Sequence, residues 1–235
     1  MFIICLILIL AVFLGFTVYS KPVHAVLVDY SAMKQAAPNL YVEPGLPSTE
    51  QEELLRTVES AESRIINVFG GRSTSPKIIF AVSQKALHNY AENPTGQTYY
   101  YPWNNYIVIG PEGLNEGVIS HELTHAELRG RLHNKHEVPA WFDEGLATMV
   151  DGRYTEYERV WNEVTAQGKA AVNYGLLESH KAFDYGTADA QKNYNLACYE
   201  VSRWFKVAGQ DGLLQFIDAL NTGGDFKEQY NRLGP

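Results

Sequence analysis

Cysteine and basic residues are both scarce in this chain of 235 residues. Of the two cysteines, Cys5 lies inside an apolar N-terminal run, and Cys198 is left without a disulfide partner, so the cysteines do not indicate a redox compartment. The 19 lysines and arginines are outnumbered by 27 acidic residues and form no basic stripe. Because phosphate binding requires concentrated positive charge, we expect no nucleic-acid partner.

Several common catalytic patterns are missing as well. The sequence contains no G-x-S-x-G, no C-x-x-C and no glycine-rich phosphate loop, and it shows neither an internal repeat nor a low-complexity tract. Apolar residues make up 46% of the chain and charged residues 20%, which is ordinary globular usage and argues against disorder. The length suits one domain or a domain of two lobes.

The N-terminus is apolar from residue 2 to residue 19 and carries no charge there. The segment SKPVHA follows, with small residues at positions 23 and 25, as a signal peptidase requires for cleavage after Ala25. Residues 1–25 therefore read as a signal peptide or, because the run is long and no Lys or Arg precedes it, as an uncleaved membrane anchor. Both versions place residues 26–235 outside the cytoplasm, although Lys21 opposes that orientation. We predict an extracytoplasmic protein, secreted, periplasmic or held at the membrane.

Turn residues and periodic apolar segments predict an α+β protein. Residues 26–48 read as a strand or an irregular linker, and residues 49–235 as one folded region. Its N-terminal lobe, about 49–130, would hold a small mixed sheet with helices, and its C-terminal lobe, about 131–235, would be helical. Strands are expected at 77–82 and 106–110, and helices at 48–69, 83–91, 114–128, 139–150, 155–166, 192–208, 211–221 and 224–232. The strand 106–110 is either an exposed edge that can pair with an extended peptide or an internal strand.

The segment VISHELTHAELRG, residues 118–130, is the strongest candidate for a functional site. On a helix, His121 and His125 lie one turn apart on the same face and can both reach one metal ion. Zinc suits this arrangement, because imidazole is a favoured ligand and a catalytic site keeps one position open for water. Glu122 is rotated by about 100° from His121, beside the ion, where it can take a proton from water. The alternative is a solvated helix face that binds nothing.

A third ligand is expected from the segment AWFDEGLA. Eighteen residues separate His125 from Glu144, which stands among apolar helix positions where burial without a partner would be costly. A zinc ion would be that partner. Zinc-bound imidazoles are usually held by a further hydrogen bond, and Asp151, two turns after Glu144 on the same face, is the candidate to provide it. Asp143 is the alternative, and either carboxylate can equally be a helix-terminal charge.

The combination of HELTH, an 18-residue gap and WFDEG resembles the gluzincin zinc metallopeptidases. The small size is similar to the compact bacterial peptidase MA-like domains. The resemblance implies a zincin-like fold in which His121, His125 and Glu144 bind zinc and Glu122 is the general base. Its specific part covers residues 118–151. The G-x-M-E-N element of aminopeptidases is not found, which argues against aminopeptidase activity.

The resemblance also nominates a residue to stabilise the oxyanion. The segment KNYNLACYEVSRWF is similar to the helix that follows the zinc site in peptidase MA-like domains, and it points to Tyr194. The alternative role for Tyr194 is packing on an amphipathic helix, and Tyr199 and His180 are weaker candidates. Glu127 departs from the family, where this position is often apolar, but it falls outside the ligand set.

The sequence therefore predicts a zinc-dependent peptidase that hydrolyses peptides or proteins outside the cytoplasm. Two other readings stay open. A zinc-containing binding or scaffold protein would keep the ligands and cleave little, but it would not need Glu122. A membrane-associated domain without metal would show unchanged or raised stability in a Glu144→Ala variant.

Overall fold

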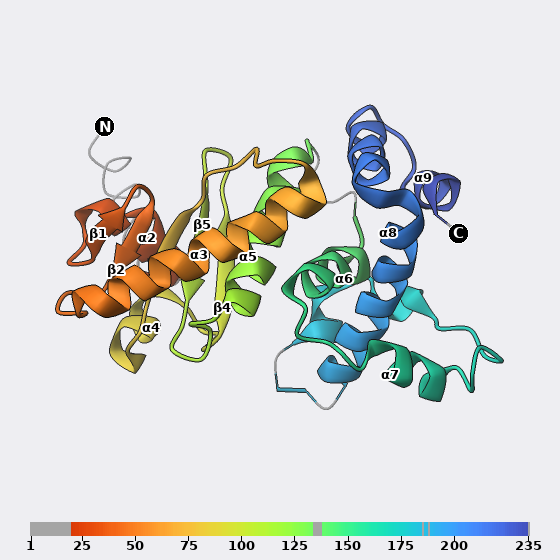
Figure 1. Cartoon of the computed structure of the whole chain (residues 1–235), viewed down its shortest axis with the longest axis horizontal. Helices are drawn as coiled ribbons and strands as arrows, with labels where there is room; N and C mark the ends of the chain where they lie inside the picture. The colour runs from red at the N-terminus through yellow and green to blue at the C-terminus, as the bar shows by residue number, and fades with distance from the viewer. Residues whose placement is uncertain (1–19, 134–137, 185, 188, 235) are drawn as a thin grey trace, which may run out of the picture. The chain divides into compact units, whose positions relative to one another are not determined.

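The structure is a computed structural model that describes residues 20–133, 138–184, 186–187 and 189–234 (Figure 1). It is an α+β protein, as predicted. The chain divides into two units. Of the described residues, unit 1 comprises those up to 55 together with 75–114, and unit 2 comprises 56–74 and those from 115 onward. This division differs from the predicted boundary near residue 130, because the helix that carries HELTH packs against the helix that follows it.

Unit 1 contains a five-stranded mixed sheet with the strand order β1-β2-β3-β5-β4. Its strands are β1 (Lys34–Ala37), β2 (Leu40–Val42), β3 (Lys77–Phe80), β4 (Gly96–Tyr100) and β5 (Asn105–Ile109). The strands β2, β3 and β5 are parallel, and β1 and β4 pair antiparallel at the two edges. The strand β5 is thus internal and buried along its whole length, so the exposed edge considered for 106–110 is wrong.

The described residues before the sheet, 20–30, form helical structure that packs against the sheet. Helix α2 (Ser20–Val26) and the 3-10 turn η1 (Val28–Tyr30) share a core cluster with helix α4 (Gln84–Tyr90) and with strand residues such as Ile79 and Val108. Within α2, Ala25 is 0% exposed, and the His24 ring nitrogen Nδ1 donates to the Asn89 carbonyl at 2.9 Å. The predicted cleavage point after Ala25 therefore lies inside a packed helix.

The apolar run 2–19 lies outside the described residues. Among the helices that the structure does describe, none combines the length and the apolar character needed to cross a membrane. Helix α3 (Ser48–Phe69), which begins and ends where the sequence predicts, runs from unit 1 into unit 2.

Unit 2 is helical. Its elements after α3 are α5 (Glu116–Arg131), α6 (Ala140–Asp151), α7 (Tyr157–Val164), η2 (Tyr174–Leu177), η3 (His180–Phe183), α8 (Ala190–Asn221) and α9 (Phe226–Leu233). The two helices predicted at 192–208 and 211–221 join as α8 across Gly209, whose φ of 65° interrupts the helical geometry. Helices α6 and α8 lie side by side (Figure 1). Aromatic rings hold α6, α8 and α9 together, and buried Trp204 donates its indole N–H to the Tyr230 carbonyl.

Candidate functional site

Helix α5 carries the two histidines and is buried on all sides from residue 118 to residue 128. The Asn115 side chain caps its first turn by accepting from the Val118 N–H at 3.0 Å. Every residue from Val118 to Leu128 is buried, including the polar ones. A solvated helix face is therefore excluded, because buried polar side chains need partners inside the protein.

Helix α6 brings Glu144 to the same place. Glu144 is 7% exposed, and the next residue, Gly145, lies against the backbone of α8. A Cβ atom at Gly145 would come within 2.5 Å of the Ala197 carbonyl oxygen. Only glycine allows this approach, so the packing of α6 on α8 fixes the height at which Glu144 faces α5.

Three side-chain atoms from α5 and α6 converge on one point. The Nε2 atoms of His121 and His125 are 3.1 Å apart, and Glu144 Oε2 lies 3.4 Å from the first and 3.5 Å from the second. All the ligand atoms of this trio are within 4.8 Å of one another. These are the three residues that the sequence predicts as metal ligands, and together they can hold a metal ion.

The Nδ1 atom of each histidine is in hydrogen-bond contact with an aspartate carboxylate. Asp151 Oδ2 lies 3.0 Å from His121 Nδ1, and Asp143 Oδ1 lies 2.8 Å from His125 Nδ1. An ionised carboxylate only accepts, so both imidazoles donate from Nδ1. The sequence presented Asp151 and Asp143 as alternatives, whereas the structure places one behind each ring.

Two arginines hold these carboxylates in turn. Arg129 donates to Asp143 Oδ2 from Nε at 3.2 Å and from Nη2 at 2.6 Å. Arg153 donates to Asp151 Oδ2 from Nε at 3.0 Å and from Nη2 at 2.7 Å, and its backbone N–H donates to Oδ1. The sequence reasoning missed both arginines. The spacing offers a weak signal, since Arg129 is one turn after His125 and Arg153 is two residues after Asp151.

The convergence of two Nε2 atoms and a carboxylate oxygen requires a positive charge between them. With Nδ1 donating, a neutral imidazole presents a lone pair at Nε2, and two such lone pairs at 3.1 Å repel. A proton shared by the two rings would relieve this repulsion. It would leave Glu144 Oε2 buried with no hydrogen-bond partner among the described residues, as it is here. A divalent cation satisfies all three atoms at once, so the residues fit a metal ion.

The pKa values of the site residues agree with a site that favours positive charge. Burial of the His125 imidazole by itself lowers its pKa, but the Asp143 and Glu144 carboxylates outweigh burial and hold the pKa well above the ordinary value. Burial likewise opposes ionisation of Glu144, yet His125 and His121 hold the pKa of this carboxyl well below its usual range. A proton and a bound metal ion would therefore compete for the same nitrogens.

Glu122 is also buried on α5 and lies within electrostatic reach of Arg153. Burial lowers the Arg153 pKa, and Asp151 first, then Tyr154 and Glu122, raise it above its ordinary value. The predicted base and the arginine behind His121 thus belong to one charged cluster.

The tyrosines near the site differ in what their hydroxyls contact. The Tyr194 ring lies 6.3 Å from the His121 ring, but its hydroxyl donates to the Phe183 carbonyl at 3.1 Å. Tyr154, which the sequence reasoning missed, lies 5.4 Å from Tyr194 ring to ring, and burial raises its pKa to about 12 despite the nearby Arg153. Within the described part of the chain its hydroxyl has no hydrogen-bond partner. Tyr199 stacks on Trp161 at 4.4 Å, which is a packing role.

His180, the other weaker candidate, contacts the ligand set. Its Nδ1 lies 3.1 Å from Glu144 Oε1, and its Nε2 lies 3.5 Å from an Arg129 nitrogen. The side chain is 57% exposed. His180 therefore holds the second oxygen of Glu144 from the solvent side, which leaves Oε2 directed at the two histidines.

Comparisons of the chain with protein-family models, with curated proteins and with solved structures give no match. Function is therefore inferred from the geometry within unit 2.

Proposed function

We propose that this protein is a zinc-dependent peptidase of the gluzincin type, with a zincin-like fold, that acts on peptides or proteins outside the cytoplasm. The observation that carries the proposal is Glu144 Oε2, buried without a hydrogen-bond partner among the described residues and directed at two histidine nitrogens. His121, His125 and Glu144 would be the zinc ligands, two imidazoles and one carboxylate, which is a donor set typical of catalytic rather than structural zinc.

The side chains around the trio supply the remaining chemistry. A bound zinc ion supplies a Lewis acid that polarises the scissile carbonyl and lowers the pKa of water. The Glu122 carboxylate accepts the proton from the attacking water and later donates it to the amine that leaves. The oxygen that becomes negative in between needs a further donor. Tyr194 stays the residue proposed for it, and Tyr154 is a second candidate because no described residue forms a hydrogen bond with its hydroxyl.

The surrounding charges keep the ligands in one arrangement. Asp143 and Asp151 fix both imidazoles with Nδ1 as donor and Nε2 as ligand atom. Arg129 and Arg153 fix the two aspartates, each through two N–H groups. The protein's own hydrogen bonds thus hold the ligand side chains, which reduces the ordering that ion binding would otherwise require.

The test compares the unchanged chain with Glu122→Gln, both loaded with zinc, in a peptide-library digest read by mass spectrometry. Bound metal is measured on the same samples. We expect one zinc per chain in both proteins and cleavage by the unchanged chain. The glutamine variant should cleave about 10²- to 10⁴-fold more slowly, the usual size of a general-base contribution. Glu158→Gln, at an exposed position on α7, is the matched control and should behave as the unchanged chain.

The outcomes separate the three readings. Zinc in both proteins with cleavage in neither would favour a zinc-containing binding or scaffold protein. Cleavage that survives in Glu122→Gln would remove this glutamate from the mechanism. No zinc and no cleavage would refute the metal site itself.

A further inference from the structure

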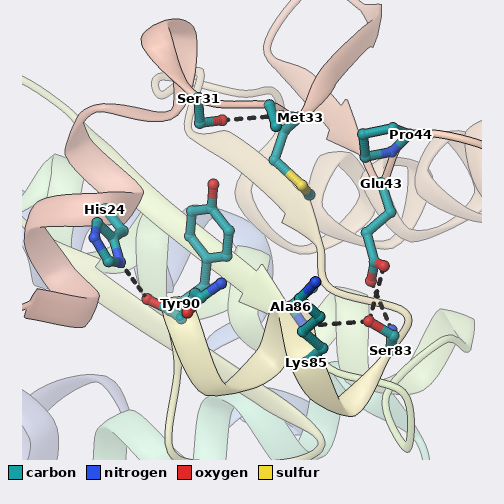
Figure 2. Close-up of a pocket in the computed structure, with 11 residues that line it drawn as sticks. His24, Ser31, Met33, Glu43, Pro44, Ser83, Lys85, Ala86 and Tyr90 are labelled. Carbon is teal, nitrogen blue, oxygen red and sulfur yellow. Dashed lines mark hydrogen bonds between the residues drawn. The ribbon is translucent and has the colours of Figure 1, made fainter.

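Unit 1 contains a pocket of about 450 Å³ where α2 and the residues after it meet α4 (Figure 2). Its carboxylate, Glu43, accepts from the backbone N–H and the hydroxyl of Ser83. No described residue of its lining has a buried side-chain nitrogen or oxygen without a hydrogen-bond partner. The pocket therefore indicates no ligand of a particular chemistry, in contrast to the carboxylate of Glu144 in unit 2.

The two oxygens of the Glu144 carboxylate lie in different surroundings. Oε2 is 3.4 and 3.5 Å from the Nε2 atoms of His121 and His125 and has no hydrogen-bond partner among the described residues. Oε1 lies 3.1 Å from Nδ1 of His180, whose side chain is 57% exposed. One oxygen is thus left for an ion, whereas the other is in contact with an imidazole on the solvent side.

Arg129 determines which nitrogen of His180 carries the hydrogen. Its guanidinium can only donate, and its Nη2 lies 3.5 Å from His180 Nε2, so Nε2 is the acceptor. In the neutral ring Nδ1 then carries the hydrogen and donates it to Glu144 Oε1. The same Nη2 donates to Asp143 Oδ2 at 2.6 Å, and Asp143 Oδ1 accepts from His125 Nδ1. One arginine therefore supports two of the three proposed ligands, His125 through Asp143 and Glu144 through His180.

The backbone that carries His180 is fastened to α8. The carbonyl of Ala182 accepts from the Asn193 side-chain N–H at 2.7 Å, and the carbonyl of Phe183 accepts from the Tyr194 hydroxyl at 3.1 Å. The Phe183 ring is buried and lies 5.1 Å from the Tyr194 ring. Helix α8 also packs on α6, which carries the ligand carboxylate. The exposed ring of His180 thus extends from a backbone that is held in place beside α6.

We propose that His180 is a positioning residue that restricts Glu144 to one ligand oxygen, and that it thereby favours zinc over larger ions such as manganese. A carboxylate can bind an ion through one oxygen or through both. One oxygen and two imidazoles make three ligand atoms, as in catalytic zinc sites. A second oxygen would suit manganese, which accepts more oxygen ligands. The inference rests on the proposed metal site and adds what selects its ion.

The test measures metal binding by the full chain and by His180→Ala. Competition with a chromophoric chelator gives the affinities for zinc and manganese. The visible absorption of bound cobalt reports its coordination number, because four-coordinate cobalt absorbs more strongly than five- or six-coordinate cobalt. We expect His180→Ala to bind zinc about 10- to 100-fold more weakly, the usual effect of losing a partner of a ligand. It should lose less affinity for manganese, and its cobalt absorption should weaken.

Two variants serve as controls. His180→Asn is the rescue variant, because its side-chain amide N–H can take the place of Nδ1–H and donate to Glu144 Oε1. It should restore most of the zinc affinity and the cobalt absorption. His88→Ala removes an exposed histidine of α4 in unit 1 and should behave as the unchanged chain. Thermal unfolding without metal checks that each variant is folded.

The outcomes distinguish this role from the metal site itself. Equal zinc affinity and equal cobalt absorption in His180→Ala and the unchanged chain would overturn the role and leave the metal site in place. Equal losses for zinc and manganese with unchanged cobalt absorption would also overturn it, since they indicate a general structural effect. A His180→Asn variant that behaves as His180→Ala would exclude the hydrogen bond as the cause. Failure of the unchanged chain to bind any of the three ions would instead refute the proposed function.

Discussion

Asp151 and Asp143 each accept a hydrogen bond from one of the two histidines, and this arrangement gives a direct prediction for metal affinity. An Asp151→Asn variant keeps an oxygen for His121 Nδ1–H but loses the charge that Arg153 and the imidazole share. We expect zinc affinity to fall about 10- to 100-fold, the usual effect of removing such a partner. Competition with a chromophoric chelator measures it.

Asp189→Asn is the control for this prediction, because the Asp189 side chain is 73% exposed and contacts Lys192 rather than the histidines. An unchanged affinity in Asp151→Asn would show that the carboxylate is a structural charge at the end of α6 and has no influence on the metal site.

Glu127 gives a prediction about pH. It is 1% exposed, and its carboxylate accepts from the backbone and hydroxyl of both Ser73 and Thr74 and from Arg131 Nε at 2.7 Å. Burial raises the Glu127 pKa, but these bonds outweigh it and hold the pKa below its ordinary value. The folded pKa is thus below the unfolded one of about 4.3, so the stabilisation is complete above that pH and is lost as the pH falls through the folded pKa.

We therefore expect Glu127→Gln to be less stable than the unchanged chain at pH 7, by about 1–3 kcal/mol for lost bonds to a charged acceptor. The difference should shrink below about pH 4, where the unchanged chain also loses the charge. Urea unfolding of both proteins across pH 3–7 measures it. Stability curves that stay parallel over this range would contradict the role given to the carboxylate.

At the scale of residues, the sequence predicts those features of the site that follow from the spacing of residues along one helix. His121 and His125 are one turn apart on one helix, so their shared direction follows from local geometry. The contacts of Arg129 and Glu127 are different in kind. Apart from the i,i+4 pair of Glu127 with Arg131, they depend on how α5 meets α6 and the residues that follow α3, and local spacing gives at most a weak signal of that packing.

Helix α2 supports a prediction at the scale of elements. Its Ala25 is 0% exposed, His24 bonds to Asn89, and Lys21 forms an ion pair with Glu92. A variant that lacks residues 1–25 loses these contacts, whereas a variant that lacks only 1–19 keeps them. We expect the shorter protein to unfold at a temperature several degrees lower, since removing one buried side chain and its neighbours costs about 1–3 kcal/mol.

Differential scanning calorimetry of the two variants measures this difference. Equal unfolding temperatures would show that α2 adds nothing to unit 1, and the chain would then tolerate cleavage after Ala25 without loss. A lower temperature for the shorter protein would mean that such cleavage weakens the fold.

The elements that sequence predicts well are those with strong local signals. The helices α3, α4 and α6 have 3.6-residue periodicity and end signals such as Ser83 and Gly152, and their observed ends lie within two residues of the expected ones. The strands β1, β2 and β4 are three to five residues long and lie among turn residues, so their pairing partners decide that they are strands. The same dependence explains why the position of β5 within the sheet was not predictable.

At the scale of the whole molecule, the division into two units predicts which part of the chain metal binding would stabilise. All three proposed ligands belong to unit 2, whereas the sheet belongs to unit 1. Zinc at about 100 times its dissociation constant stabilises the state that binds it by about 2.7 kcal/mol. Amide exchange in α5 and α6 should slow by about two orders of magnitude where it occurs through unfolding of unit 2, and exchange in β3 and β5 should stay unchanged.

Hydrogen exchange followed by mass spectrometry, with zinc and with a chelator, measures both units in one experiment. Glu144→Gln is the control, because loss of a ligand should abolish the zinc effect in α5 and α6 while β3 and β5 again stay unchanged. Equal slowing in β3, β5, α5 and α6 would mean that the two units unfold as one cooperative body. The stability of the sheet would then depend on an ion held entirely by helices of the other unit.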